Sequence, residues 1–234
     1  MERIDKIISE HTYYSRKEIK KLISQKAVYV NGEEVKRPEC KFDETAISIT
    51  INGEEIEIRK HIYLLLNKPK GYVSATENKT DKTVLDLVPV EYKYRDLFPA
   101  GRLDKDTTGL MLITDDGEFA HNILSPRKHV QKEYEVVLDI PVTEAMVVGF
   151  KDGINLNDGE CKTAYLEITG EYSAKVTITE GRYHQIKRMF GCFAAKVVEL
   201  NRIRIGNLYL PKELALGEVK EATDTELQKI QERN

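Results

Sequence analysis

The change of hydrophobic pattern near residue 60 is the feature that most constrains how this chain can fold. Before that point, the isoleucines from Ile47 to Ile51 alternate with polar residues, which is typical of strands buried on one face. From Ile62 to Leu66 the apolar residues are continuous, which is typical of a strand buried on both faces. We therefore predict two domains, a small module over residues 1–59 and a larger domain over residues 60–234.

Two short helices are predicted at the start of the small module. Ile4, Ile7 and Ile8 recur at helical spacing and indicate the first helix. Ser15 and Glu18 have the spacing of a capping box, which predicts the start of the second helix. The second helix also carries four cations that fall largely off its apolar stripe, where they would face solvent or a ligand: Arg16, Lys17, Lys20 and Lys21.

Hairpins complete the small module. Val28–Val30 is a short apolar run that ends at Asn31-Gly32, a strong sequence indication of a tight hairpin turn. A second Asn-Gly pair, Asn52-Gly53, follows the alternating isoleucines. Two helices and a few hairpins in this length predict an αβ module with a thin core.

Composition and cysteine spacing restrict the class of protein. Hydrophobic residues make up 41% of the chain and charged residues 32%, as in a globular protein. No apolar run approaches the roughly 18 residues that a membrane span needs. Cys40, Cys161 and Cys192 share no ligand spacing, so neither disulfides nor a metal site is expected. We expect a cytoplasmic protein without membrane contact.

Positive charge is concentrated locally although the net charge is -3. Basic residues outnumber acidic ones from Arg16 to Lys41, and again from Gly181 to Arg204, where Glu199 is the single acid. Local basic patches suit a polyanionic partner bound on one face. Ordinary solvated surface is the alternative, and charge alone favours that alternative.

Asp104 is the candidate reactive group. It follows Arg102 in the run Gly101–Leu110 and precedes a polar turn that contains Gly109. The apolar run Leu110–Ile113 then predicts a buried strand. A carboxylate on a turn backed by such a strand is held rigidly and can point into a cleft.

The motifs around Asp104 resemble those of a known family. Gly-Arg-Leu-Asp followed by Thr-Thr-Gly-Leu and Thr-Asp-Asp-Gly is similar to the active-site motif of pseudouridine synthases, specifically the RsuA-type ribosomal RNA branch. The resemblance implies that Asp104 is the catalytic aspartate. It also assigns Tyr134, in a Lys-x-Tyr-x-Val pattern, and Lys187, in a His-Gln-x-basic pattern, to the catalytic site. Leu200 matches the leucine that packs against the pocket floor.

The resemblance implies an α+β fold. The larger domain is expected to be a mixed, mostly antiparallel sheet flanked by helices. The small module, from the Ser15 capping box to Asn31-Gly32, resembles the alpha-L RNA-binding module, in which the basic second helix lies against structured RNA. A charged helix of a regulatory or dimerisation module is the alternative.

Substrate contacts are expected from further residues of the larger domain. Lys68 lies in the turn Asn67–Tyr72, which matches the family's first motif, and either an RNA contact or a basic surface turn would explain it. His184 is interpreted as structural, because no triad partner stands at a recognisable spacing. Asp106 follows Asp104 closely, but nothing in the sequence orients it toward the same site. The full set of expected substrate contacts is Arg102, Leu200, Lys68 and Arg188, with Arg16, Lys17, Lys20 and Lys21 on the basic helix.

The chemistry implied by the resemblance is an isomerisation of uridine in RNA. The base must leave its stack, an ionised carboxylate must act on the sugar or base, and the detached uracil must be kept from water. No electrons or groups enter from outside, so no cofactor is expected. The expected partner of this monomer is ribosomal RNA or a pre-ribosomal particle.

Small-subunit ribosomal RNA is favoured because the run Gly181–Met189 resembles that branch of the family more than the large-subunit branch. Three alternatives remain open. These are a large-subunit enzyme, a non-catalytic ribosome assembly factor, and a carboxylate-dependent hydrolase of small molecules. The hydrolase would need a second acid or a metal near Asp104.

Overall fold

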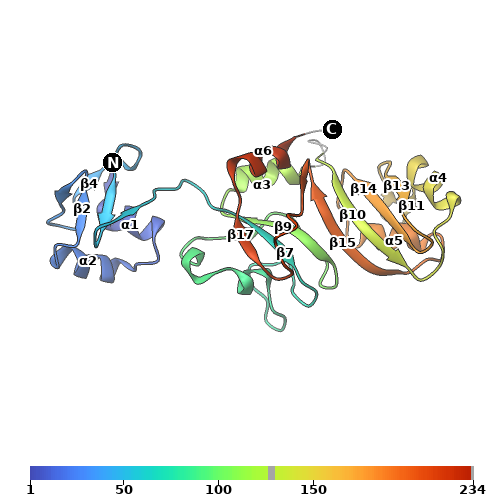
Figure 1. The fold of residues 1–234 in the computed structure, drawn as a ribbon, viewed down its shortest axis with the longest axis horizontal. Helices are drawn as coiled ribbons and strands as arrows, with labels where there is room; N and C mark the ends of the chain where they lie inside the picture. The colour runs from blue at the N-terminus through green and yellow to red at the C-terminus, as the bar shows by residue number, and fades with distance from the viewer. Residues whose placement is uncertain (126–129, 233–234) are drawn as a thin grey trace. The chain divides into compact units, whose positions relative to one another are not determined.

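The computed structural model describes residues 1–125 and 130–232 (Figure 1). The chain forms two compact units. The N-terminal unit contains Met1–Ile62 and Val88–Leu97, and the C-terminal unit contains Tyr63–Leu87 and Phe98–Asn234. Because Val88–Leu97 belongs to the first unit, the chain is not divided by one cut, and the domain boundary after residue 59 stays a prediction.

The N-terminal unit combines two helices with short antiparallel strands. Its sheet has the order β3-β2-β5-β6, and a separate pair joins β1 to β4. The elements are β1 (Glu2–Arg3), α1 (Ile4–His11), α2 (Arg16–Ser24), β2 (Val28–Val30), β3 (Glu33–Glu34), β4 (Lys41–Phe42), η1 (Glu44–Ala46), β5 (Ile49–Ile51), β6 (Glu54–Ile56) and η3 (Val90–Tyr92). Asn31 and Gly32 both have positive φ, as a tight hairpin turn between β2 and β3 requires.

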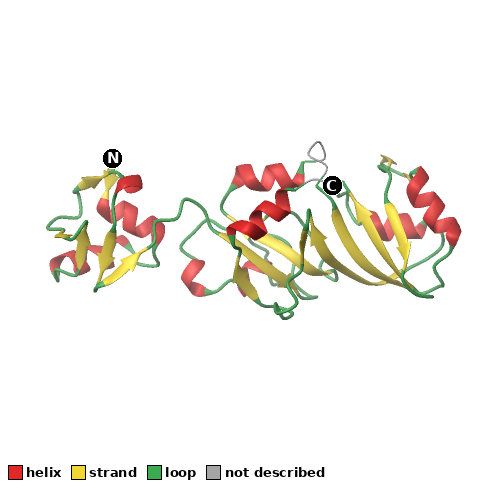
Figure 2. Ribbon diagram, turned by 45° about the horizontal axis from the view of Figure 1, so that its top comes forward, coloured by secondary structure: helices red, strands yellow, loops and turns green. Residues whose placement is uncertain are grey.

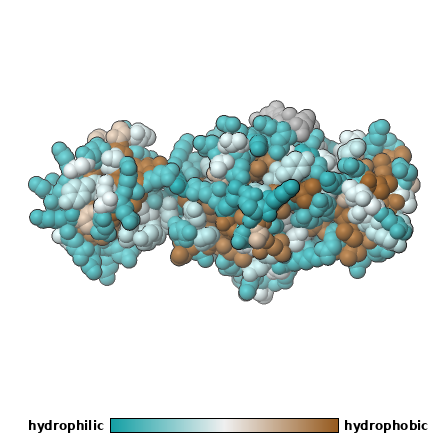
Figure 3. All heavy atoms as spheres, in the orientation of Figure 1, coloured by the Kyte–Doolittle hydropathy of each residue, from teal (hydrophilic) through white to brown (hydrophobic). Residues whose placement is uncertain are grey.

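Helix α2 confirms the predicted capping box. Ser15 accepts a hydrogen bond from the backbone of Glu18, and the Glu18 side chain accepts one from the backbone of Ser15. The helix buries Ile19 and Ile23 in the core of the unit. Its four basic residues are exposed, and hydrophilic residues dominate the surface of this unit in Figure 3. The basic face is therefore accessible to a polyanion.

The C-terminal unit is built on a nine-stranded sheet with the order β13-β14-β10-β15-β9-β7-β17, to which β16 and β8 add at β15 and β9. The sheet is mixed and mostly antiparallel, as predicted. β15 runs parallel to β9, whereas the other strand pairs of the sheet are antiparallel. Its strands are β7 (Tyr63–Lys68), β8 (Phe98–Pro99), β9 (Thr108–Thr114), β10 (Lys132–Leu138), β13 (Tyr165–Ile168), β14 (Ser173–Ile178), β15 (Val197–Ile205), β16 (Leu208–Tyr209) and β17 (Val219–Glu221). A separate hairpin joins β11 (Asn155–Leu156) to β12 (Gly159–Glu160).

Two pairs of helices pack on this sheet (Figure 2). Phe119 of α3 and Ile230 of α6 share a core cluster with Leu65 of β7 and Leu110 of β9. At the other end, α4 contacts β13, and Phe150 of α4 packs on an aromatic ring of α5. The helices are α3 (Gly117–Leu124), α4 (Glu144–Asp152), α5 (Gln185–Gly191) and α6 (Asp224–Gln231), with the short η2 (Val84–Leu87).

No helix in the described part of the chain has the length and apolarity that a membrane span requires.

The two halves of the sheet meet where β9 pairs with β15. This parallel pairing comprises Thr108 with Asn201 and Gly109 with Arg202. A Cβ atom on Gly109 would lie 2.3 Å from the backbone oxygen of Arg202, and Gly109 has a φ of +105°. Glycine is therefore required at this junction, which directly follows the Asp104 loop.

Replacing Gly109 tests this junction. Gly109→Ala is expected to lower the free energy of unfolding by about 3 kcal/mol, because the methyl group adds backbone strain and a clash with β15. Urea denaturation followed by circular dichroism measures the change. Gly117→Ala is the matched control, because nothing lies within 4 Å of a Cβ at that position. Equal stability of the two variants would contradict the assignment.

Candidate active site

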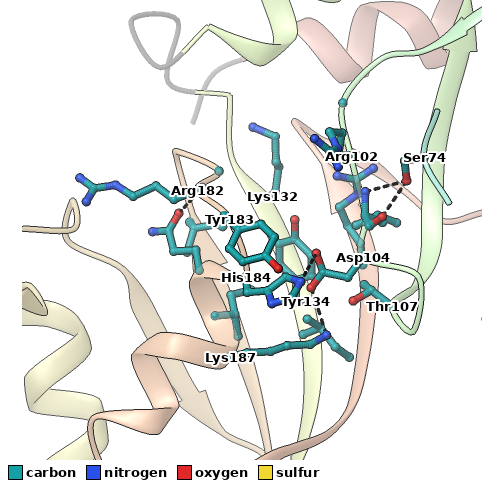
Figure 4. Close-up of a pocket in the computed structure, with 18 of the residues that line it drawn as sticks. Ser74, Arg102, Asp104, Thr107, Lys132, Tyr134, Arg182, Tyr183, His184 and Lys187 are labelled. Carbon is teal, nitrogen blue, oxygen red and sulfur yellow. Dashed lines mark hydrogen bonds and ion pairs between the residues drawn. The ribbon is translucent and has the colours of Figure 1, made fainter. Parts of the chain in front are cut away.

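A cavity of about 530 Å³ opens at the centre of the C-terminal unit. It is lined by the loop 101–107 before β9, by the segment 181–187 at the start of α5, and by strands β10 and β15. Figure 4 shows Asp104, Tyr134 and Lys187 facing this cavity from three different segments. The structure therefore brings together the three residues that the sequence motifs assign to catalysis.

Lys187 pairs with two carboxylates. Its Nζ lies 3.0 Å from Oδ2 of Asp104 and 2.6 Å from Oδ1 of Asp106. Burial lowers the pKa of Lys187, but the hydrogen bonds to Asp106 and Asp104 outweigh burial and raise its pKa above the ordinary value. The same contact holds the pKa of Asp106 below its usual range. Lys187 is therefore cationic at neutral pH and favours the ionised form of Asp106.

Asp106 was not expected at this site. Nothing in the sequence oriented it, whereas in the structure Lys187 holds it beside the cavity. The ammonium group of Lys187 consequently pairs with Asp104 and Asp106 at the same time. Asp106 is the more exposed of the two, since 70% of its side chain is accessible against 25% for Asp104.

His184 corrects the sequence interpretation. It was expected to be structural, but it lines the cavity, and its Nε2 lies 3.5 Å from Oδ1 of Asp104. Its ring is stacked on the ring of Tyr183 at a centroid distance of 3.9 Å. His184 precedes α5 as its N-cap and has left-handed backbone angles, so no helical spacing in the sequence indicates this contact.

Tyr134 and Leu200 come from neighbouring strands. Tyr134 lies on β10 opposite Arg202 of β15, and Val136 lies opposite Leu200. Tyr134 is 7% exposed, and both Tyr134 and Leu200 line the cavity. Arg102 is exposed and lines the cavity as well. Tyr134, which the motifs assign to catalysis, and Leu200 and Arg102, which were expected as substrate contacts, thus all lie at the cavity, and their roles stay predictions.

Lys68 does not occupy the position expected from the sequence. It is fully buried at the end of β7, so it is neither a surface turn residue nor accessible to RNA. Its Nζ donates to the carbonyl oxygens of Thr107 at 2.8 Å, Asp104 at 3.0 Å, Pro69 at 3.2 Å and Lys105 at 3.4 Å. Burial lowers the pKa of Lys68 to about 8. Lys68 therefore holds the backbone of the Asp104 loop from behind.

Arg188 does not line the cavity either. Its guanidinium pairs with Asp158 and donates to the carbonyl oxygen of Tyr183 at 3.1 Å. It supports the segment that carries Tyr183 and does not extend into the site. The cations of α2 belong to the other unit and are exposed there.

The cavity wall also contains donors that the sequence analysis did not identify. Within residues 1–125 and 130–232, Nη2 of Arg202 and Oγ1 of Thr107 are buried without a hydrogen-bond partner. Lys132 is buried and donates to the carbonyl oxygen of Val130 at 3.3 Å, and burial and then Arg202 lower its pKa to about 8. Lys132 and Lys187 lie on opposite sides of Tyr134 in Figure 4. A ligand with several acceptor oxygens would match these donors.

Removing the Lys68 amine tests its role behind the loop. Lys68→Met is expected to lower the free energy of unfolding by about 2–3 kcal/mol, because four carbonyl groups, one of them in a buried hydrogen bond, lose a charged donor. Urea denaturation at pH 7 gives the difference. Lys70→Met is the control, because Lys70 forms an exposed pair with Glu199 that contributes less than about 1 kcal/mol. A Lys68 variant as stable as the Lys70 variant would refute this role.

Comparisons with known proteins agree with the motifs. Residues 62–191 match the RNA pseudouridylate synthase family, and residues 2–44 match the S4 domain. The chain is 40% identical over 98% of both chains to the Bacillus subtilis protein named uncharacterized RNA pseudouridine synthase YtzG. It is 39% identical to ribosomal small subunit pseudouridine synthase A of Escherichia coli, over 97% of this chain and 99% of that one.

A solved structure agrees in fold along the whole chain. The crystal structure of a pseudouridylate synthase superposes with a TM-score of 0.69 at 39% sequence identity, covering 98% of this chain and all of that one. The resemblance inferred from the motifs is thereby confirmed. The chain belongs to the RNA pseudouridine synthase family and carries an S4 domain at its N-terminal end.

Proposed function

We propose that this protein converts a specific uridine of small-subunit ribosomal RNA to pseudouridine, with Asp104 as the catalytic carboxylate. The substrate is inferred from relatives named ribosomal small subunit pseudouridine synthase A. Those of Yersinia pestis and Escherichia coli are each 39% identical to this chain over 97% of its length. The observation that carries the proposal is the meeting of Asp104, Lys187 and Tyr134 at one cavity.

Lys187 supports the chemistry of Asp104. A uridine extruded from RNA enters the cavity, since the reacting atoms are inaccessible in a stacked helix. Nζ of Lys187, at 3.0 Å, pairs with the Asp104 carboxylate and orients it for attack on the sugar or base. The N1–C1′ bond breaks, the uracil rotates and a C5–C1′ bond forms. C5 loses a proton and N1 gains one, so the reaction balances without a cofactor.

The cavity wall fits a detached uracil. Tyr134 offers an aromatic face beside Asp104, and Leu200 adds an apolar surface that excludes water while the base turns. Nη2 of Arg202 and Oγ1 of Thr107 are buried in residues that line the cavity and have no hydrogen-bond partner in the described part of the chain. The cationic Lys132 suits a phosphate or carbonyl oxygen on the other side of Tyr134. These roles complete a site for one pyrimidine nucleotide.

The S4 domain supplies the expected RNA contacts outside the cavity. Its exposed cations on α2 are placed to bind phosphates of ribosomal RNA or of a pre-ribosomal particle. Phosphate contacts position a protein on RNA without reading its sequence, so specificity would come mainly from the shape of the RNA and from the cavity. We further propose a monomer that acts on its ribosomal substrate in the cytoplasm.

Two alternatives are separated from this proposal by experiment. A large-subunit enzyme would modify a large-subunit transcript in preference to a small-subunit one. A non-catalytic assembly factor would bind ribosomal RNA without forming pseudouridine, although it would have no need for the intact set of Asp104, Tyr134 and Lys187. The small-molecule hydrolase is disfavoured because the chain belongs to an RNA-modifying family, although Asp106 places a second acid beside Asp104.

Replacing Asp104 tests the catalytic assignment. Asp104→Asn is expected to reduce pseudouridine formation at least about a thousandfold, because the amide lacks the negative charge. Tritium release from small- and large-subunit transcripts labelled at C5 of uridine measures turnover, and filter binding measures RNA affinity. Asp152→Asn, on the exposed surface of α4, is the matched control. Retained turnover in Asp104→Asn would remove this residue from its role, and release from the large-subunit transcript alone would reassign the substrate.

Neutralising the basic helix tests the role of the S4 domain. The combined change of Arg16, Lys17, Lys20 and Lys21 to Gln is expected to weaken RNA binding at every RNA sequence. The slope of log affinity against log salt should fall by about one for each phosphate that α2 no longer binds. The maximal rate at saturating RNA should change little, because these residues lie outside the cavity. An unaltered salt slope would show that α2 faces away from the RNA.

A further inference from the structure

Tyr183 and His184 form an aromatic pair at the edge of the cavity. Their rings are 3.9 Å apart with an interplanar angle of 17°, so they are stacked face to face. The edge of the His184 ring faces Asp104, whose Oδ1 lies 3.5 Å from Nε2. Tyr183 is 74% exposed although it lines the cavity. One face of the Tyr183 ring therefore packs on His184, and the other is open.

Two arginines hold the backbone of this pair in place. Arg188 pairs with Asp158 and also donates to the carbonyl oxygen of Tyr183. Arg182 donates to the carbonyl oxygens of Gly159 and Glu160 in the hairpin of β11 and β12. The segment is thus braced on a neighbouring hairpin by charged hydrogen bonds. An exposed tyrosine with such support loses little freedom when a ligand binds it.

The backbone of His184 is strained. Its φ of 48° and ψ of 35° place it in the left-handed region, which non-glycine residues seldom occupy. Strain of this kind is kept where the surroundings require it, and it concentrates at functional sites. Here the unusual conformation lets His184 face Asp104 while it stacks on Tyr183 (Figure 4). The strain therefore orients the aromatic pair.

The cavity consequently has an inner and an outer aromatic ring. Tyr134 is 7% exposed and lies beside Asp104, where an extruded uracil would be enclosed. Tyr183 is largely outside, so its open face meets whatever part of the RNA adjoins the extruded nucleotide. Neighbouring nucleobases are the aromatic groups nearest to an extruded uridine in an RNA chain. The two tyrosines are therefore suited to two different bases.

We propose that Tyr183, backed by His184, is a second nucleobase-binding site, which stacks on the base adjacent to the uridine extruded into the cavity. This inference rests on the proposed function, since it presupposes an RNA substrate with an extruded uridine. Stacking on an aromatic side chain contributes about 1–3 kcal/mol per base and tolerates any base. The site holds the neighbouring nucleotide splayed away from its stack, which keeps the target from returning to the helix.

A binding cycle tests this site with the full chain. Affinity is measured in an Asp104→Asn background, so no turnover is needed, with a small-subunit ribosomal RNA transcript as probe. Adding Tyr183→Ala is expected to weaken binding about tenfold, whereas Tyr183→Phe, which keeps the ring, should restore most of the affinity. Tyr165→Ala is the matched control, because Tyr165 is 65% exposed on β13 and lies outside the cavity lining.

Abasic substitutions in the RNA identify the stacked base. Removing the base on one side of the modified uridine should weaken binding to the Asp104→Asn protein about tenfold. The protein that carries both Asp104→Asn and Tyr183→Ala should bind the abasic RNA and the intact RNA equally well, because the ring that stacks on this base is already gone. Additive losses, or an unchanged affinity of the Tyr183→Ala protein, would overturn the proposal.

Turnover separates this inference from the proposed function. With Asp104 intact, Tyr183→Ala is expected to raise KM about tenfold and to change kcat much less. A fall in kcat at unchanged KM would place Tyr183 on the target base and contradict a second site. Absence of pseudouridine with the wild-type protein would refute the proposed function instead, and the affinities in the Asp104→Asn background would still report on Tyr183.

Discussion

The Lys187 ammonium group between two carboxylates is the interaction on which the rest of the site depends. Asp104 and Asp106 lie on one loop, whereas Lys187 lies on α5, so this ion pair joins segments that are distant in the chain. The loop is also held from behind by the buried amine of Lys68, which binds its backbone carbonyl groups. One lysine thus pairs with the side chain of the reactive carboxylate, and another holds its backbone in position.

Much of the fold follows from local sequence, and its long-range features do not. The capping box at Ser15 and the Asn31-Gly32 turn were predictable because their chemistry acts within a few residues. The parallel pairing at Gly109 was not, since its requirement for glycine comes from Arg202 on a distant strand. The inclusion of Val88–Leu97 in the N-terminal unit likewise depends on contacts that no local pattern encodes.

In the candidate site, too, local motifs predicted some residues, whereas the residues that depend on tertiary contacts were not predicted. Asp104, Tyr134 and Lys187 were assigned by motif, and their meeting at one cavity agrees with that assignment. Lys68 was misjudged because its flanking turn residues suggest a surface, whereas its burial depends on carbonyl groups of another loop. His184 was misjudged because its left-handed backbone, which brings its ring to Asp104, is not visible in the sequence. Residues that act through tertiary contacts were thus the ones missed.

The central claim is that one carboxylate in this cavity modifies one uridine of small-subunit ribosomal RNA. Mapping pseudouridines in ribosomal RNA from cells that carry the wild-type gene, no gene, or the gene for Asp104→Asn tests it most directly. The account predicts that a single small-subunit position is modified with the wild-type gene and unmodified in the other two strains. Identical pseudouridine maps in all three strains would contradict it.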